Sequence, residues 1–191
     1  MNAFESTLKK YLTTFADQEM YFTSDQRNLE FFEKNPTNTK AEDIRLKIGS
    51  VDATELTKQN LTEDMVNHIL RLNTDERIKK GDLSIVDAIA TLSTNGQTYR
   101  LLHFASLYCN LHRPDVFPIY SEEHFAFYKS YIKHFNLPLD AEQLTSYSVF
   151  CQVLNDLVKR LELQGKMNYL QLRKFGWLYG ETVLKEANVQ Y

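Results

Sequence analysis

Apolar residues recur every three to four positions along most of the chain, and this spacing predicts helices from one end of it to the other. The opening stripe consists of Phe4, Leu8, Tyr11, Leu12 and Phe15. Further helical segments are predicted over 28–34, 40–48, 52–59, 65–72 and 85–92. Strand-type alternation of apolar and polar residues does not stand out over any length, so the pattern favours an all-α fold.

Three pairs of polar residues have the spacing of a capping box at the start of a helix. They are Thr23 with Gln26, Asn60 with Glu63, and Ser84 with Asp87. In such a box the first side chain accepts a hydrogen bond from a free backbone N–H of the first turn. The pairs therefore predict where three of the helices in the first half begin.

The clearest internal turn is Ser93-Thr94-Asn95-Gly96, and we place a lobe boundary there. Four helices are predicted after it, over 97–112, 122–136, 141–163 and 168–186. The predicted architecture is a compact all-α fold of about nine to ten helices. It has an N-terminal helical lobe over 1–92 and a C-terminal helical lobe over 97–191, packed together as one domain.

The composition is that of an ordinary globular protein: 43% of the residues are hydrophobic and 25% are charged, which argues against disorder. The formal net charge is −3 and the isoelectric point is near 6.0. Sequence-independent nucleic-acid binding depends on Lys and Arg that neutralise phosphates. The overall charge therefore argues against indiscriminate nucleic-acid binding.

Cysteine usage and hydropathy predict a reduced, cytoplasmic protein. Cys109 and Cys151 are the only cysteines, and neither lies in a CxxC pair. Lys9 and Lys10 interrupt the apolar pattern at the N-terminus, where a secretory signal would need a continuous apolar segment. No apolar run is long enough to cross a membrane, so we expect no membrane association through a spanning helix.

The common signatures of nucleotide-dependent enzymes and hydrolases are absent. The chain contains no GxGxxG and no GxxxxGK[ST], the loops that hold nucleotide phosphates. It also contains no GxSxG elbow and no HExxH zinc motif. We therefore expect no cofactor, and any catalytic activity would depend on residues that the fold brings together from distant positions.

A metal site is the next possibility to test, because Cys109 and His112 at i and i+3 share a helix face. His124 or Glu123 from the following helix could supply a third ligand. A zinc site needs three or four convergent ligands. His103 points to the opposite side of the same helix. The sequence therefore predicts a buried Cys and a hydrogen-bonded His, and no metal.

The triplet Ser121-Glu122-Glu123 is typical of a helix start. Ser121 is a good N-cap, and carboxylates in the first turn interact favourably with the positive end of the helix dipole. This structural interpretation explains the triplet without catalysis. Glu122 and Glu123 are nonetheless the best placed carboxylates for an acid or base near the segment, and they are our weak catalytic candidates.

Aromatic residues gather in the same region, and they are open to two interpretations. The rings are Tyr108, Tyr120, Phe127, Tyr128 and Tyr131. In the first interpretation the rings line a cleft and stack on a nucleic-acid base. In the second they form part of the core. The lack of Lys and Arg between them favours the second interpretation. The nearest candidates for phosphate contacts are Arg100, Arg113, Lys129 and Lys133.

The segment 103–124 resembles the core motif of divergent helix-hairpin-helix DNA glycosylase-like proteins. Phe104-Ala105-Ser106 with Tyr108-Cys109 matches the helix of that motif, His112 and Pro114 match its stop, and Phe117-Pro118-Ile119-Tyr120 matches its linker. The terminal Phe175-Gly176-Trp177-Leu178-Tyr179-Gly180 resembles the end of the same group. The resemblance covers the C-terminal half of the chain.

The resemblance implies a helical fold without the usual chemistry. In active members a Lys attacks the sugar and an Asp assists it, and these positions hold Leu107 and Ser121 here. Neither side chain can take over the role of the residue that it replaces. The Gly-rich hairpin that binds DNA phosphate is also missing. The candidates for a binding cleft are Tyr108, His112, Tyr120, Ser121, His124 and Trp177.

Three functions follow from these observations. The first is a non-catalytic relative of the glycosylase fold that binds nucleic acid, with DNA as the expected partner, or binds another protein. The second is a monofunctional DNA glycosylase that uses Glu122 or Glu123 as a displaced carboxylate. The third is a structural protein whose aromatic surface binds another chain. We favour the first.

Overall fold

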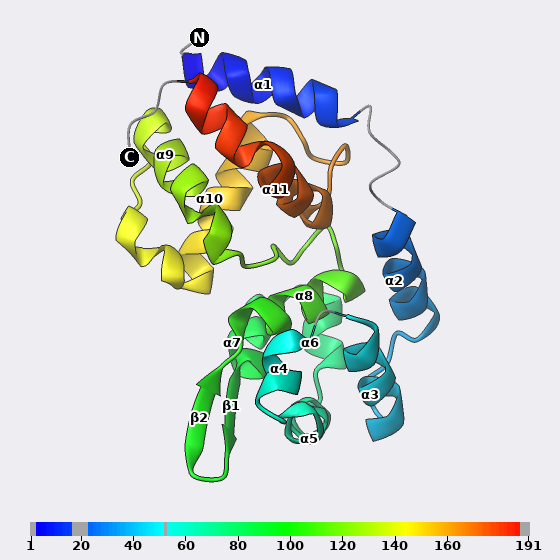
Figure 1. The fold of residues 1–191 in the computed structure, drawn as a ribbon. Helices are drawn as coiled ribbons and strands as arrows, with labels where there is room; N and C mark the ends of the chain where they lie inside the picture. Colours follow the sequence, from blue (N-terminus) through cyan, green and yellow to red (C-terminus); the bar gives the residue numbers. More distant parts are fainter. Residues whose placement is uncertain (1–2, 17–22, 52, 188–191) are drawn as a thin grey trace. The chain divides into compact units, whose positions relative to one another are not determined.

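The computed structural model describes residues 3–16, 23–51 and 53–187, and it is mostly α-helical (Figure 1). Over these residues it has eleven α-helices and one two-stranded hairpin. The contacts divide the chain into two units. Unit 1 takes its residues from 1–21 and 121–191, and unit 2 from 22–120. The predicted helical fold class is confirmed.

Unit 2 is built around one buried helix, α8 (Leu102–His112). Nine residues of α8 are buried, from Leu102 to Leu111 with the exception of His103. Helices α7 and α2 pack against it. The elements of unit 2 before α8 are α2 (Thr23–Lys34), α3 (Ala41–Ser50), α4 (Thr54–Lys58), α5 (Thr62–Leu72), α6 (Asp75–Lys80), α7 (Ser84–Ala90), β1 (Thr91–Thr94) and β2 (Gln97–Arg100).

Unit 1 joins the N-terminal helix to the C-terminal part of the chain. Helix α1 (Ala3–Ala16) lies along α11 (Tyr169–Glu186), and Figure 1 shows the two side by side. Four of the five residues of the predicted stripe, Phe4, Leu8, Leu12 and Phe15, are buried, and Tyr11 is half-buried. The remaining elements are η2 (Glu122–His124), α9 (Phe125–Phe135), η3 (Ala141–Thr145) and α10 (Tyr147–Arg160).

The helix predicted over 97–112 begins only at Leu102, because the residues before it form a hairpin. Strands β1 and β2 pair antiparallel, from Thr91↔Arg100 to Thr94↔Gln97. Asn95 and Gly96 both have positive φ, at 49° and 73°. That is the backbone of a two-residue hairpin turn, for which Asn-Gly is the preferred pair. The strands are only four residues long and mostly exposed, so their alternation is too short to detect.

The break in the pattern at 93–96 is therefore a hairpin turn inside unit 2. The predicted lobes 1–92 and 97–191 differ from the two units, because both sides of this turn belong to unit 2. The division in the structure falls after Tyr120 instead. Helix α1 joins unit 1 because its apolar face packs against α11, which a local pattern does not show.

Two of the three predicted caps are wrong. Asn60 has φ of 56°, and Leu61 occupies the N-cap position of α5. Ser84 is the first residue of α7, after Leu83 at the N-cap. The Thr23 side chain lies outside the described residues. A capping box is present at the start of α11, where it is formed by Asn168 with Gln171.

The remaining differences are short interruptions. The helix predicted over 141–163 is divided into η3 and α10, and the one over 122–136 begins with η2. Helix α6 was not among the predicted segments; it has only six residues, which is fewer than two helical turns and too short to show an apolar repeat.

No helix within the described residues is long and apolar enough to cross a bilayer.

Candidate functional site

A pocket of about 240 Å³ lies on unit 1, between the η2–α9 segment and α11. Its lining includes four of the candidate residues singled out from the sequence: Glu123, His124, Phe127 and Trp177. The rest of the lining is Ala126, Gly176, Gly180, Glu181 and Leu184. We call this set the His124 pocket.

Two glycines of α11 form the wall opposite η2 and α9. Gly176 and Gly180 are four residues apart and therefore share one helix face. A Cβ at Gly176 would lie 3.0 Å from His124 Nδ1, which is closer than side chains normally approach. A Cβ at Gly180 would lie 3.8 Å from the Phe127 Cβ, which is ordinary contact. Gly176 is thus the residue that lets the imidazole lie against the α11 backbone.

The imidazole of His124 is 6% exposed, and its two ring nitrogens have no hydrogen-bond partner among the described residues. Burial lowers the pKa of His124, and nearby Glu123 only partly opposes that effect. The ring is therefore neutral near pH 7, with one N–H donor and one acceptor. A buried polar group without a partner is costly, and the uncharged ring is the less costly form in a buried position.

Glu123 lies at the edge of the same pocket. Its carboxylate Oε1 is 3.7 Å from His124 Nε2, beyond hydrogen-bond distance, and 4.0 Å from an Arg173 guanidinium nitrogen. The Ser121 hydroxyl donates to Glu123 at 2.8 Å. Ser121 does occupy the N-cap position of η2, but it makes no side-chain cap hydrogen bond. Glu122 is exposed and does not line the pocket.

Trp177, the single tryptophan of the chain, is 69% exposed on α11. Most large apolar side chains of the protein are buried, so an exposed indole at a pocket edge is unusual. Glu181 follows one helical turn later and lies on the same face as Trp177. Together they place an aromatic ring and a carboxylate beside the buried imidazole.

The other cleft candidates, Tyr108, His112 and Tyr120, belong to unit 2 and do not line the His124 pocket. Tyr120 is 4% exposed, and its backbone N–H donates to the Ser106 hydroxyl at 2.9 Å. Its carbonyl lies 2.8 Å from His103 Nδ1. The linker of the motif is thus fixed to α8 by hydrogen bonds, and these tyrosines are core residues, as the second interpretation of the aromatic cluster proposes.

Unit 2 contains a second polar constellation that the sequence analysis missed, a buried network around Asn38. The Asn38 Oδ1 accepts hydrogen bonds from the Lys47 ammonium group at 2.9 Å and the Tyr108 hydroxyl at 2.5 Å. Two donors to one oxygen fix the orientation of the amide. Its nitrogen then donates to Thr74 and Asp75. Asn38, Lys47, Thr74 and Tyr108 are almost fully buried.

His112 lies at the edge of this Asn38 network, with Nε2 3.4 Å from the Asn38 amide nitrogen. Burial and the neighbouring Lys47 charge lower the pKa of His112 to about 3, so the ring is neutral near pH 7. Burial also raises the pKa of Cys109, which is a free, buried thiol. The described residues contain no group of three metal-ligating side chains.

Three of the four candidates for phosphate contacts are already bound to acceptors within their own unit. In unit 2, Arg100 pairs with Asp87 at 2.9 Å and Arg113 donates to the Lys79 carbonyl at 2.6 Å. In unit 1, Lys129 pairs with Glu142 at 2.7 Å, while Lys133 is exposed.

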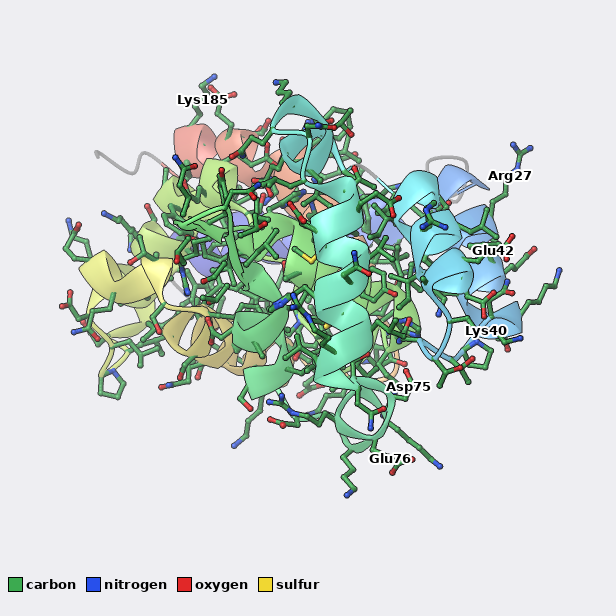
Figure 2. All side chains as sticks on the ribbon, turned by 90° about the horizontal axis from the view of Figure 1, so that it is seen from below. Arg27, Lys40, Glu42, Asp75, Glu76 and Lys185 are labelled. Atoms are coloured by element: carbon green, nitrogen blue, oxygen red, sulfur yellow. The ribbon has the colours of Figure 1, made fainter. Side chains whose placement is uncertain are left out.

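Elsewhere on unit 2 the two signs of charge are mixed. Figure 2 shows Arg27, Lys40 and Glu42 directed outward from the same edge of this unit, with Asp75 and Glu76 at α6. A surface that attracts nucleic acid needs a continuous basic stripe or patch. The labelled residues do not form one.

Comparison with known proteins assigns the chain to a family that is defined by an N-terminal domain. Residues 7–116 match the family HI_0787_N, described as an N-terminal domain, and the chain belongs to this family. An uncharacterized protein of Haemophilus influenzae (strain ATCC 51907 / DSM 11121 / KW20 / Rd) is 27% identical over 126 residues. That alignment covers 64% of this chain and 59% of the relative. No solved structure matches the chain significantly.

The His124 pocket lies after residue 116, so the family match does not include it. The Asn38 network lies inside the match. The function of the pocket is therefore argued from its own geometry.

Replacing Gly176 with alanine should lower the free energy of unfolding by about 1–2 kcal/mol. The new methyl group would press on the His124 ring, and overpacking outweighs the gain in helix propensity. Gly180→Ala is the matched control: its methyl group has room, so this change should be neutral or stabilising. Urea unfolding of the two variants checks the difference, and equal effects would contradict the close contact at Gly176.

Proposed function

We propose that this protein is a non-catalytic helical module that binds a partner protein, and that the His124 pocket receives one side chain of that partner. The resemblance to helix-hairpin-helix glycosylase-like proteins supports the absence of catalysis, because Leu107 and Ser121 replace the reactive Lys and Asp. Leu107 is also buried, at 7% exposure, in the apolar helix α8.

One observation carries the proposal: the exposed indole of Trp177 lies beside a buried imidazole that lacks hydrogen-bond partners among the described residues. Tryptophans are enriched among the residues that dominate protein–protein binding energy. A partner group that enters the pocket would cover the exposed indole and remove its apolar surface from water.

The size of the pocket favours a single inserted group. Pockets that enclose a drug-sized ligand measure about 300–1,000 Å³, whereas the His124 pocket measures about 240 Å³. One amino-acid side chain fills such a volume, and the rest of the partner would lie on the surrounding surface.

The charges favour a protein over a nucleic acid. The lining includes two carboxylates, Glu123 and Glu181, and no Lys or Arg. Phosphate groups would be repelled by these carboxylates, while nucleic-acid affinity depends on basic side chains. Three of the four candidates for phosphate contacts already bind acceptors of the protein itself.

A selection of random peptides against the full chain tests this proposal, with Trp177→Ala as the key variant. We expect selected peptides to bind the wild type and to bind Trp177→Ala at least about tenfold more weakly, the loss of one hot-spot residue. Binding is measured by fluorescence anisotropy of labelled peptides. Leu46→Ala is the control, because Leu46 is also a large exposed apolar residue, at 58%, but belongs to unit 2.

Two results would contradict the proposal. Peptides that bind Trp177→Ala as tightly as the wild type would place the interaction elsewhere on the surface. A single-stranded oligonucleotide that binds at low salt, and loses binding in Trp177→Ala, would replace the protein partner with nucleic acid.

A further inference from the structure

The His124 pocket has the charge of a site for a cation. Among its lining residues the groups that carry charge near pH 7 are the carboxylates of Glu123 and Glu181. They come from different elements, η2 and α11, so they approach the pocket from two sides. An entering group with positive charge would meet a carboxylate on each side.

The carboxylates have basic neighbours, but these pairs are exposed. Lys185 lies 2.6 Å from Glu181, with 68% and 75% of the two side chains exposed. Arg173 approaches Glu123 only to 4.0 Å, and Glu123 is 54% exposed. Ion pairs of this kind contribute little to stability, because water screens them. A cationic ligand can therefore replace Lys185 or Arg173 beside these carboxylates at a small cost in stability.

The buried imidazole does not oppose a cation. Because burial lowers its pKa, His124 is uncharged near pH 7. Its nitrogens have no hydrogen-bond partner among the described residues, which is an observation independent of the carboxylates. The pocket wall thus combines a neutral polar ring with acidic edges.

The indole of Trp177 is a further group of the His124 pocket that can bind a cation. A cation over the face of a tryptophan is attracted by the ring, and tryptophan is the strongest of the aromatic side chains in this respect. A guanidinium group suits the site better than an ammonium group, because it is planar, stacks on aromatic faces and binds carboxylates through two parallel hydrogen bonds.

We infer that the His124 pocket recognises an arginine side chain of the partner, stacked on Trp177 and bound by Glu123 and Glu181. This inference rests on the proposed function and specifies the chemistry of the inserted group.

The test uses the full chain and two probes, N-acetyl-arginine methylamide and N-acetyl-citrulline methylamide. Citrulline has nearly the same shape as arginine and carries no charge. Because Trp177 is the single tryptophan, intrinsic fluorescence reports directly on the pocket. Both titrations are made at constant ionic strength. We expect the citrulline probe to bind at least about tenfold more weakly, since it loses both the cation–π and the charge-assisted contacts.

Variants of the two glutamates provide a second test of the same inference. Glu123→Gln and Glu181→Gln should each weaken binding of the arginine probe several-fold and leave the citrulline probe unchanged. Glu122→Gln is the matched control: this glutamate adjoins Glu123 in the chain, is exposed and does not line the pocket. It should leave both probes unaffected.

The outcomes separate the inference from the proposed function. If both probes bind equally, or if a peptide without arginine binds in a Trp177-dependent manner, the cation preference is wrong and the protein-binding pocket stands. If the selection gives no peptide whose binding depends on Trp177, and neither probe changes the fluorescence, then the inferred arginine site and the proposed protein-binding function are both wrong. Equal losses in all three glutamate variants would show general attraction to an acidic surface, and would overturn the assigned contacts.

Discussion

Replacing Asn38 with alanine should lower the free energy of unfolding by about 3–5 kcal/mol, the typical cost of removing one partner of a buried charge. The Lys47 ammonium group would keep only the Thr37 carbonyl, at 2.7 Å, as an acceptor. The Tyr108 hydroxyl would lose its acceptor in the same buried space. Urea unfolding of the full chain measures the loss.

Two further variants make this expectation specific. Asn67→Ala removes an exposed amide of α5 and should change stability by no more than about 0.5 kcal/mol. The double variant Asn38→Ala/Lys47→Met removes the charge together with its acceptor, and it should regain a large part of the loss. If the double variant were as unstable as the sum of its parts, the buried charge would not be the cause.

Stability should also rise with pH because of Lys47. Burial lowers the pKa of Lys47 from 10.5 to about 8, against the opposing effects of Asp75 and Asp43. Below pH 8 both the folded and the unfolded chain hold the proton, and the full cost of the buried charge is present. Between pH 8 and 10.5 the folded chain loses the proton while the unfolded chain still binds it. The free energy of unfolding therefore rises, by about 3 kcal/mol over this window.

The measurement is the difference between the wild type and Lys47→Met in urea unfolding across pH 7–10.5, because other groups titrate in the same range. The wild type should gain about 3 kcal/mol relative to the variant. Lys40→Met is the control, since Lys40 is exposed and directed outward (Figure 2), and it should follow the wild type. Parallel curves for the wild type and Lys47→Met would show that Lys47 does not titrate in this window.

Most of the helices could be predicted because each buries one stripe of regularly spaced apolar residues, as α1 does against α11. The hairpin could not, since its strands are short and mostly exposed. The turn residues Asn95 and Gly96 are visible in the sequence, but only the φ values show that they reverse a strand.

The site was predicted in part. Glu123, His124 and Trp177 were singled out, and the structure brings them together in one pocket. The role of Gly176 depends on the His124 ring, which is 52 positions earlier in the chain, and no local pattern reports such an approach. Lys47 follows the charged residues Glu42, Asp43 and Arg45 in α3, where a solvent-exposed lysine is the usual case. Only its packing against the loop at Asn38 reveals the buried network.

The position of α1 bears on how the protein can be divided into fragments. The family match, 7–116, begins inside α1 and ends before unit 1 resumes at Ser121. A fragment with those limits would keep Leu8, Leu12 and Phe15 but lack α11, against which α1 packs. The apolar face of α1 would then be exposed to water, and an exposed apolar face promotes aggregation of the fragment. A fragment that begins after α1, near the start of α2, avoids this exposed face.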